Sequence, residues 1–209
     1  MEKLTDTMFS KMLEDRHGAE FVARMRKARV AVAGLGGLGS NVAVLLVRMG
    51  IYRLHLIDFD KVELSNLHRQ QYRQQDIGCY KTQALSKYLL QINPFLQLKT
   101  DCLRLTEDNA ASVLAEDEII CEALDAAEAK AMLISTILRK LPEKKIVAAS
   151  GMAGIGSGNA IRTRKITGRL YLCGDEISDC ENQPLTAARV ALCAAHQAHI
   201  ISRIILGLE

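Results

Sequence analysis

Apolar residues along the chain fall into short continuous runs, separated by longer segments with helical spacing. The first run, RVAVAG at 29–34, is followed by a glycine-rich segment, an apolar segment that ends at Gly50, and a second run, RLHLID at 53–58. Short apolar runs next to glycine indicate buried strands, and the strand–helix–strand order indicates a parallel βαβ unit. The pattern therefore predicts that the core begins with such a unit.

The same alternation continues through the middle of the chain. Further strands are predicted near 96–101, 118–123 and 144–150, and further helices over about 81–92, from Thr106, and over about 126–140. Strands that alternate with helices favour a parallel sheet with helices on both of its faces. We therefore predict an α/β protein with a Rossmann-like, mostly parallel sheet.

The two ends of the chain depart from this alternation. Residues 1–28 are interpreted as an N-terminal helical arm with a break at Gly18, and residues 29–209 as one domain, because no linker or repeat divides them. Near the other end, two strand-like pieces at 159–166 and 169–173 predict an antiparallel hairpin. The apolar stretch at 185–206 predicts a long C-terminal helix.

Composition narrows the class of protein. The 209 residues are 49% hydrophobic, which is enough for the core of one domain, and 27 Lys+Arg against 24 Asp+Glu give a charge of only +3. That balance makes nucleic acid an unexpected partner. No secretory signal and no membrane-spanning apolar stretch is seen, so we expect a cytoplasmic protein without a membrane partner. The six cysteines form no CxxC pair, so we expect reduced thiols and no zinc site.

A glycine loop after the first strand is the first candidate site. Gly34, Gly36 and Gly39 form a GxGxxG pattern, and Asp58 stands at the end of the next strand. Glycines let a backbone approach phosphates, the following helix offers free N–H groups, and the carboxylate can bind ribose hydroxyls. The pattern does not choose between NAD and ATP, and a purely structural glycine turn is a further alternative.

Charged residues at later strand ends favour ATP. The segment IDFDKVELSNLHRQQ at 57–71 supplies acidic groups and Arg69, and Lys81 follows. Arginine and lysine can neutralise a triphosphate, and Asp125, after the next central strand, could hold Mg²⁺. An NAD-dependent oxidoreductase would leave Arg69, Lys81 and Asp125 without a role.

These motifs together resemble the ThiF/MoeB-type adenylyltransferases of the ubiquitin-activating superfamily. The resemblance rests on GLGGLGSN, DFDKVELSNLHRQ, Lys81 and Asp125, and it extends to DRHG at 15–18, INP at 92–94, EALDAAEAKAML, AASGMAG, YLCGDE and AAHQA. The later segments are most similar to the short ThiF type, the adenylyltransferases of sulfur carrier proteins. One departure is AARV at 187–190, where relatives tend to have APRV.

The resemblance implies a role for each matching residue. A nucleotide would be bound by Gly36, Gly37, Asp58, Asp60, Asn66, Arg69 and Lys81, with the last three in contact with the phosphates, and Asp125 would bind Mg²⁺. Arg69, Lys81, Asp125 and Arg16 would be catalytic. The family is typically homodimeric, and Arg16 is the nearest match to an N-terminal arginine that reaches into the partner's site.

The implied reaction uses ATP and Mg²⁺ and adenylates a small carrier protein. The C-terminal Gly carboxylate of a ubiquitin-like, ThiS-like sulfur carrier would be joined to AMP with release of pyrophosphate, in thiamine thiazole biosynthesis. The alternatives are an ATP-dependent dehydratase acting on a modified tRNA adenosine, the NAD-dependent oxidoreductase, and a catalytically silent half of a heterodimer. The silent half is disfavoured because all the phosphate ligands are present.

Several smaller features leave alternatives open. The thiol of Cys173 or Cys180 could accept the carrier after its adenylation. Cys193, His196 and His199 share one helical face with a spacing that resembles a metal site, but a packed or dimer-facing helix is favoured. The segment GMAGIGSG at 151–158 is either part of a channel for the carrier tail or a flexible turn. Two further arginines, Arg162 and Arg164, could face an acidic carrier surface, or simply solvent.

Overall fold

A computed structural model describes residues 4–209, so residues 1–3 of the predicted arm lie outside the described residues. Its centre is one seven-stranded sheet with the order β3-β2-β1-β4-β5-β7-β6. The strands are β1 (Arg29–Ala33), β2 (Arg53–Ile57), β3 (Gln97–Asp101), β4 (Ile119–Glu122), β5 (Lys145–Ala149), β6 (Arg162–Lys165) and β7 (Leu170–Gly174). Neighbouring strands are parallel except β6 and β7, which are antiparallel. This confirms the predicted mostly parallel, Rossmann-like sheet with a hairpin.

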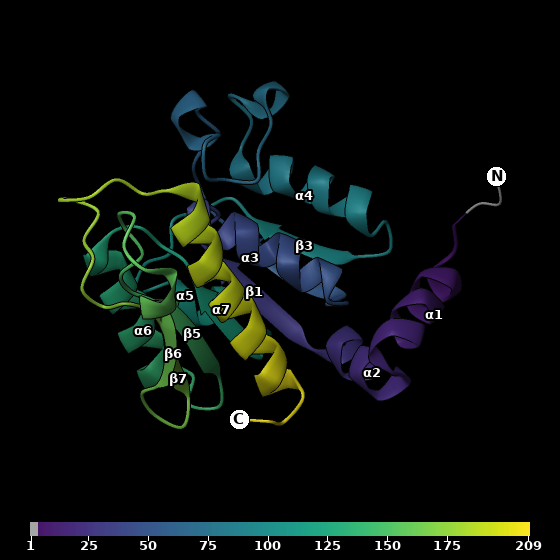
Figure 1. Cartoon of the computed structure of the whole chain (residues 1–209). Coiled ribbons are helices and arrows are strands. Elements are labelled where there is room, and N and C mark those ends of the chain that lie inside the picture. The colour runs from purple at the N-terminus through teal and green to yellow at the C-terminus, as the bar shows by residue number, and fades with distance from the viewer. Residues whose placement is uncertain (1–3) are drawn as a thin grey trace.

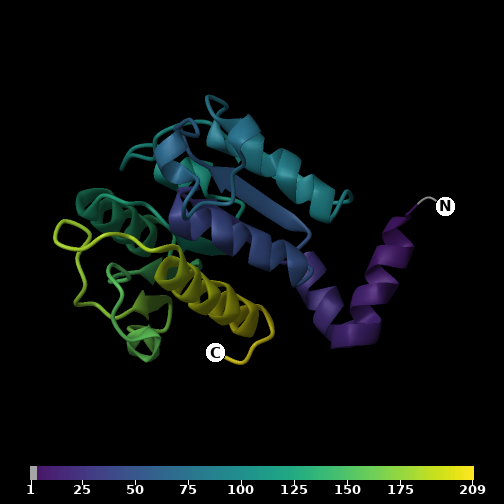
Figure 2. The ribbon, with the colours of Figure 1, turned by 45° about the horizontal axis from the view of Figure 1, so that its top comes forward.

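Helices cover both faces of the sheet, as predicted. They are α1 (Asp6–His17), α2 (Ala19–Lys27), α3 (Gly37–Arg48), α4 (Lys81–Ile92), α5 (Ala110–Val113), α6 (Ala127–Lys140) and α7 (Ala187–Ile205), with 3-10 turns η1 (Leu64–Asn66), η2 (Gln74–Asp76) and η3 (Gly158–Ala160). Helix α3 lies between α4 and α7 on one face (Figures 1 and 2). Helices α5 and α6 pack on the other face. None of these helices within residues 4–209 has the length and apolarity needed to cross a bilayer.

Strand β1 shows why the predicted strands read as continuous apolar runs. Val30 and Val32 pack into the core beneath α3 and α7, whereas Ala31 and Ala33 pack into the second core beneath α5 and α6. A strand between two helical layers buries both sets of alternate side chains, so its sequence loses the polar positions of a half-exposed strand.

The arm consists of the two helices α1 and α2. The break predicted at Gly18 is present, and this residue has φ 89°, in the region that favours glycine. Helix α2 buries Val22 and Met25, whereas only Leu13 of α1 is buried. Helix α1 accordingly projects away from the sheet (Figure 1).

Two predicted helices begin later than the sequence suggested. Thr106 and Asn109 hold a turn, because the Thr106 N–H donates to Asn109 Oδ1 (2.8 Å) and the Asn109 N–H to Thr106 Oγ1 (3.3 Å), and α5 begins only at Ala110. Helix α7 begins at Ala187 because Thr186 is extended and its hydroxyl donates to the Gly154 carbonyl (3.0 Å). Local side-chain hydrogen bonds compete with the helix in both places.

Candidate nucleotide site

The glycine loop joins β1 to α3, and packing accounts for only some of its glycines. A Cβ on Gly34 would lie 2.6 Å from the Ala123 carbonyl oxygen, and one on Gly39 would lie 1.8 Å from the Gly34 oxygen. Gly36 is different, because the nearest atom to its Cβ would be Gln70 Nε2 at 3.9 Å. Packing therefore requires glycine at 34 and 39 but leaves open space beside Gly36.

The start of α3 faces this open space. Gly36 is the N-cap residue and has no side chain to bond the first amides, so the N–H groups of the first turn have no side-chain acceptor. Free amides and the helix dipole make such an end suitable for an anion. This feature and the space beside Gly36 are what a bound phosphate group would need.

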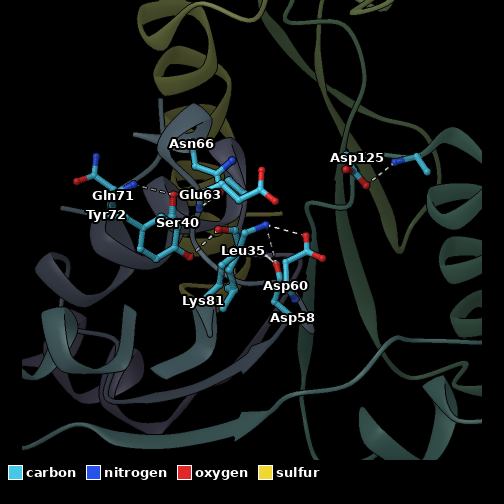
Figure 3. Close-up of polar contacts among 12 residues, drawn as sticks. Leu35, Ser40, Asp58, Asp60, Glu63, Asn66, Gln71, Tyr72, Lys81 and Asp125 are labelled. Atoms are coloured by element: carbon cyan, nitrogen blue, oxygen red, sulfur yellow. Dashed lines mark hydrogen bonds and ion pairs between the residues drawn. The ribbon is translucent and has the colours of Figure 1, made fainter. Parts of the chain in front are cut away.

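Asp58 holds the loop in place from the end of β2. Its Oδ2 accepts the Leu35 N–H (2.6 Å) and its Oδ1 accepts the Asp60 N–H (2.8 Å), as Figure 3 shows. Burial raises the pKa of Asp58, while the nearby Lys81 charge and these two amides oppose the rise. Asp58 is thus both a candidate ribose ligand and an anchor of the glycine loop.

Lys81 brings a positive charge to the same place. It is the first residue of α4, its ammonium lies 2.8 Å from Asp60 and 3.9 Å from Asp58, and it is buried. The structure thus groups Asp58, Asp60 and Lys81 beside the glycine loop (Figure 3), and their role in binding a nucleotide stays a prediction.

Arg69 and Asn66 come from the segment after β2. The Arg69 side chain runs beside Gly37, whose Cβ would lie 3.5 Å from Arg69 Cγ, and its buried Nε has no partner. Its guanidinium donates to the Ser65 carbonyl (3.1 Å). Asn66 is used locally, since its Oδ1 accepts the Glu63 N–H (3.1 Å) in the cap of η1.

Asp125 stands across β1 from this group. It follows β4, it is exposed, and its Oδ1 accepts the Ala126 N–H (2.8 Å). From β1 the strand order runs to β2 and β3 on one side, and it continues with β4 and β5 on the other side. Ligands of open α/β sheets bind at the carboxyl ends of the strands where the order switches in this way. Asp58 and Asp125 lie on either side of that point, at the ends of β2 and β4.

A magnesium ion would fit here only with help from a substrate. Within residues 4–209 no group of three or more His, Cys, Asp or Glu side chains is arranged to hold a metal. Mg²⁺ commonly takes one or two carboxylates and completes its shell with phosphate oxygens and water. The exposed Asp125 carboxylate suits that arrangement. The predicted lack of a zinc site stays a prediction.

Glu122 is a functional candidate that the sequence analysis missed. Its fully buried carboxylate accepts the Leu124 N–H (2.8 Å) and the Lys130 ammonium (2.9 Å), and burial raises its pKa. It holds the loop that leads to Asp125. An acidic residue within an apolar strand, EIICEA, was the available signal.

The two candidate acceptor thiols differ in access. Cys173 is fully buried, and burial raises its pKa to about 11, so it is unsuited to attack a substrate. Cys180 is exposed. Cys193 is buried and His196 bonds Thr163 (2.9 Å), as expected for a packed helix.

Arg16 lies outside this chain's own site. It is exposed in the last turn of α1, and the arm enters the sheet at the amino end of β1, opposite the edge that carries the glycine loop and Asp125. Any contact of Arg16 with a nucleotide would therefore involve another chain.

The fold and the glycine loop define an α/β protein of the Rossmann-like class with a candidate nucleotide site at the strand switch. Residues 9–209 match the sequence model of the ThiF family, and the chain belongs to this family. It is 36% identical over 121 residues to the sulfur carrier protein adenylyltransferase of Thermus thermophilus, covering 57% of the chain and 45% of that protein. It is 29% identical over 200 residues to the adenylyltransferase and sulfurtransferase MOCS3 of Anopheles gambiae, covering 92% and 44%. The chain thus spans less than half the length of these relatives.

Solved structures share the fold. The E. coli tRNA N6-threonylcarbamoyladenosine dehydratase TcdA, in complex with ATP, superposes with a TM-score of 0.87 at 19% identity, covering 99% of this chain and 98% of that one. E. coli MccB, with AMPCPP and MccA, superposes with a TM-score of 0.73 at 19% identity, covering 94% and 64%. At such identities the likeness concerns the fold.

Proposed function

We propose that this chain is an ATP-dependent adenylyltransferase that activates the C-terminal glycine of a small ubiquitin-like sulfur carrier. The observation that carries the proposal is the open space at Gly36, beside the Asp58–Lys81 group and across β1 from Asp125. Membership in the ThiF family and the sulfur carrier relative support it. We extend the proposal to a ThiS-like carrier and to thiamine thiazole biosynthesis, because the later segments of the sequence are most similar to the short ThiF type.

Each residue of the site would bind a different part of ATP. Asp58 would accept hydrogen bonds from the ribose hydroxyls, and the amides at the start of α3 would donate hydrogen bonds to phosphate oxygens. Arg69 and Lys81 would neutralise the charge of the phosphates. Asp125 would hold Mg²⁺, which when bound supplies charge neutralisation at the departing pyrophosphate. The open space at Gly36 would let the α-phosphate lie against the backbone.

Attack on the α-phosphate needs no general base. A terminal carboxylate has a pKa of about 3.5 and is ionised at neutral pH, so the chain must align it and stabilise charge. Arg69 and Lys81 would supply the positive charge beside the phosphates. The nucleophile is therefore delivered already charged, and catalysis rests on positioning.

One experiment tests this function. Purified chain, ATP, Mg²⁺ and labelled pyrophosphate should give exchange into ATP only when a Gly-Gly-ended carrier is added. The matched control is the same carrier without its last two glycines, which should give none. No exchange with any of several such carriers would refute the proposal.

A tRNA-directed dehydratase is the second candidate, because TcdA matches nearly the full length of this chain in fold. The low net charge of +3 speaks against a nucleic-acid substrate. The same assay separates the two functions, since a dehydratase would hydrolyse ATP in response to modified tRNA and would ignore the carrier.

We also expect a homodimer in which Arg16 acts across the interface. Helix α1 exposes Met8 and Met12 beside a charged face, which suits contact with another chain. Light scattering should give twice the chain mass, and a monomer would contradict the expectation.

Mixing two inactive variants tests the role of Arg16. Arg16→Ala and Asp125→Ala chains should each be inactive alone, but an equal mixture that exchanges subunits should recover about one quarter of wild-type activity, because half of the dimers contain one intact site. Activity would stay absent if Arg16 acted within its own chain.

A further inference from the structure

Two loops are joined by buried polar contacts at the edge of the sheet that carries the glycine loop and Asp125. The β5 loop (residues 150–157) follows β5, and the β7 loop (residues 175–186) follows β7. Both strands are parallel to β4, so both loops lie at the same edge as Asp125 and the glycine loop. They are the loops nearest to the nucleotide site on that side of the strand order.

Arg189 connects the two loops from the first turn of α7. Its side chain is 5% exposed, and its Nη1 donates to the carbonyls of Gly156 (2.6 Å) and Ser157 (2.9 Å) in the β5 loop. Its Nη2 pairs with the Asp175 carboxylate at the start of the β7 loop. One planar guanidinium thus bonds both loops at once, which an ammonium could not do with the same geometry.

Asp175 also forms hydrogen bonds with the backbone of the β7 loop. Its Oδ1 accepts the N–H groups of Ile177 (3.0 Å) and Ser178 (2.8 Å), and the Ser178 hydroxyl in turn accepts the Ala153 N–H (3.0 Å). Although partial burial opposes it, these amides and the Arg189 charge hold the pKa of Asp175 below its usual range.

The glycines of the β5 loop show that the two loops fit closely together. A Cβ on Gly151 would lie 2.1 Å from Asp175 Oδ1, and one on Gly154 would lie 2.0 Å from Gln183 Oε1. The β5 loop therefore packs against the β7 loop at Gly151 and Gly154.

The same turn of α7 also touches the nucleotide loop. Val190, next to Arg189, packs so close to Gly37 that a Cβ there would lie 3.0 Å from Val190 Cγ1. The two loops expose the side chains of Ile155 (88%) and Ile177 (90%) to solvent. A rigid support that presents two apolar side chains suits binding of another protein, because the loops need little ordering on binding.

We propose that Arg189 is a positioning residue for the carrier protein. It fixes the β5 and β7 loops relative to the glycine loop, and so sets the path by which a carrier tail reaches the α-phosphate. This inference rests on the proposed function. A merely structural arginine would affect stability and both substrates alike, whereas a positioning residue acts on the carrier alone.

The test replaces Arg189 with methionine, which keeps the length of the side chain and removes its charge and hydrogen bonds. The KM for the carrier should rise by about 10-fold or more, while the KM for ATP stays within about 2-fold. Hydrogen exchange should become faster at both loops and nowhere else. Arg203→Met, on the same helix but paired with Glu209, is the control and should leave both KM values unchanged.

A second variant covers the case in which Arg189→Met does not fold. Asp175→Asn keeps the Oδ1 acceptor of Ile177 and Ser178 and removes the charge that pairs with Arg189, so it should show the same selective rise in the carrier KM. An unchanged carrier KM in a folded variant, or equal rises for carrier and ATP, would overturn the inference. A wild-type chain with no carrier-dependent exchange would instead refute the proposed function itself.

Discussion

Replacing Asp125 with alanine is expected to lower carrier-dependent ATP–pyrophosphate exchange by ~10²-fold or more, equivalent to about 2.7 kcal/mol. The reason is that Asp125 is the carboxylate proposed to hold Mg²⁺, and the stabilisation it gives grows as pyrophosphate departs. The rate should therefore fall much more than the affinity for ATP. Exchange kinetics and direct measurement of ATP binding distinguish the two quantities.

The fold should survive this change, because the Asp125 side chain is exposed and bonds only the next residue's N–H. The matched control is Glu128→Ala, which removes an exposed carboxylate from the first turn of α6. It should leave the exchange rate and the melting temperature unchanged. If Asp125→Ala also keeps near-wild-type exchange, the magnesium assignment is wrong.

The sequence was most informative about the sheet. Strands buried on both faces, such as β1, read as apolar runs, and the segments between them keep helical spacing, so the order of elements could be predicted. Element ends were less predictable. The start of α5 depends on the Thr106–Asn109 hydrogen bonds, which compete locally with the helix.

The candidate site was predictable where its residues follow strand ends. Asp58 and the glycine loop come together because parallel strands end at one edge, and Lys81 reaches Asp58 from the first residue of α4. The buried pairs behind the site were not predictable. Arg189 bonds residues more than thirty positions earlier, and the Glu122 carboxylate is buried by the fold as a whole. The burial of one carboxylate and the hydrogen bonds between residues far apart in the sequence cannot be predicted from the local pattern of apolar and polar residues.

Glycine loops raise a question that the sequence pattern cannot answer, namely which glycines serve the fold and which serve a ligand. Gly34 has φ 91°, and a Cβ there would collide with the Ala123 backbone, whereas Gly36 has φ −75° and open space. These two positions thus separate the two roles within one loop. The same comparison tests whether the loop binds a nucleotide at all.

Gly34→Ala is expected to lower the free energy of unfolding by about 1–3 kcal/mol because of the backbone conformation alone. The steric clash with Ala123 should lower it further. Gly36→Ala should melt like the wild type, because the added methyl meets no atom closer than 3.9 Å. Its ATP affinity should nevertheless fall by about 10-fold or more, since the methyl occupies the space proposed for a phosphate.

Gly168→Ala, at the tip of the β6–β7 hairpin with nothing within 4 Å, is the control and should change neither quantity. Thermal melting and ATP titration of the three variants provide the measurements. Wild-type ATP affinity in Gly36→Ala would mean that the phosphates lie elsewhere, because a bound phosphate and the new methyl group cannot share that space.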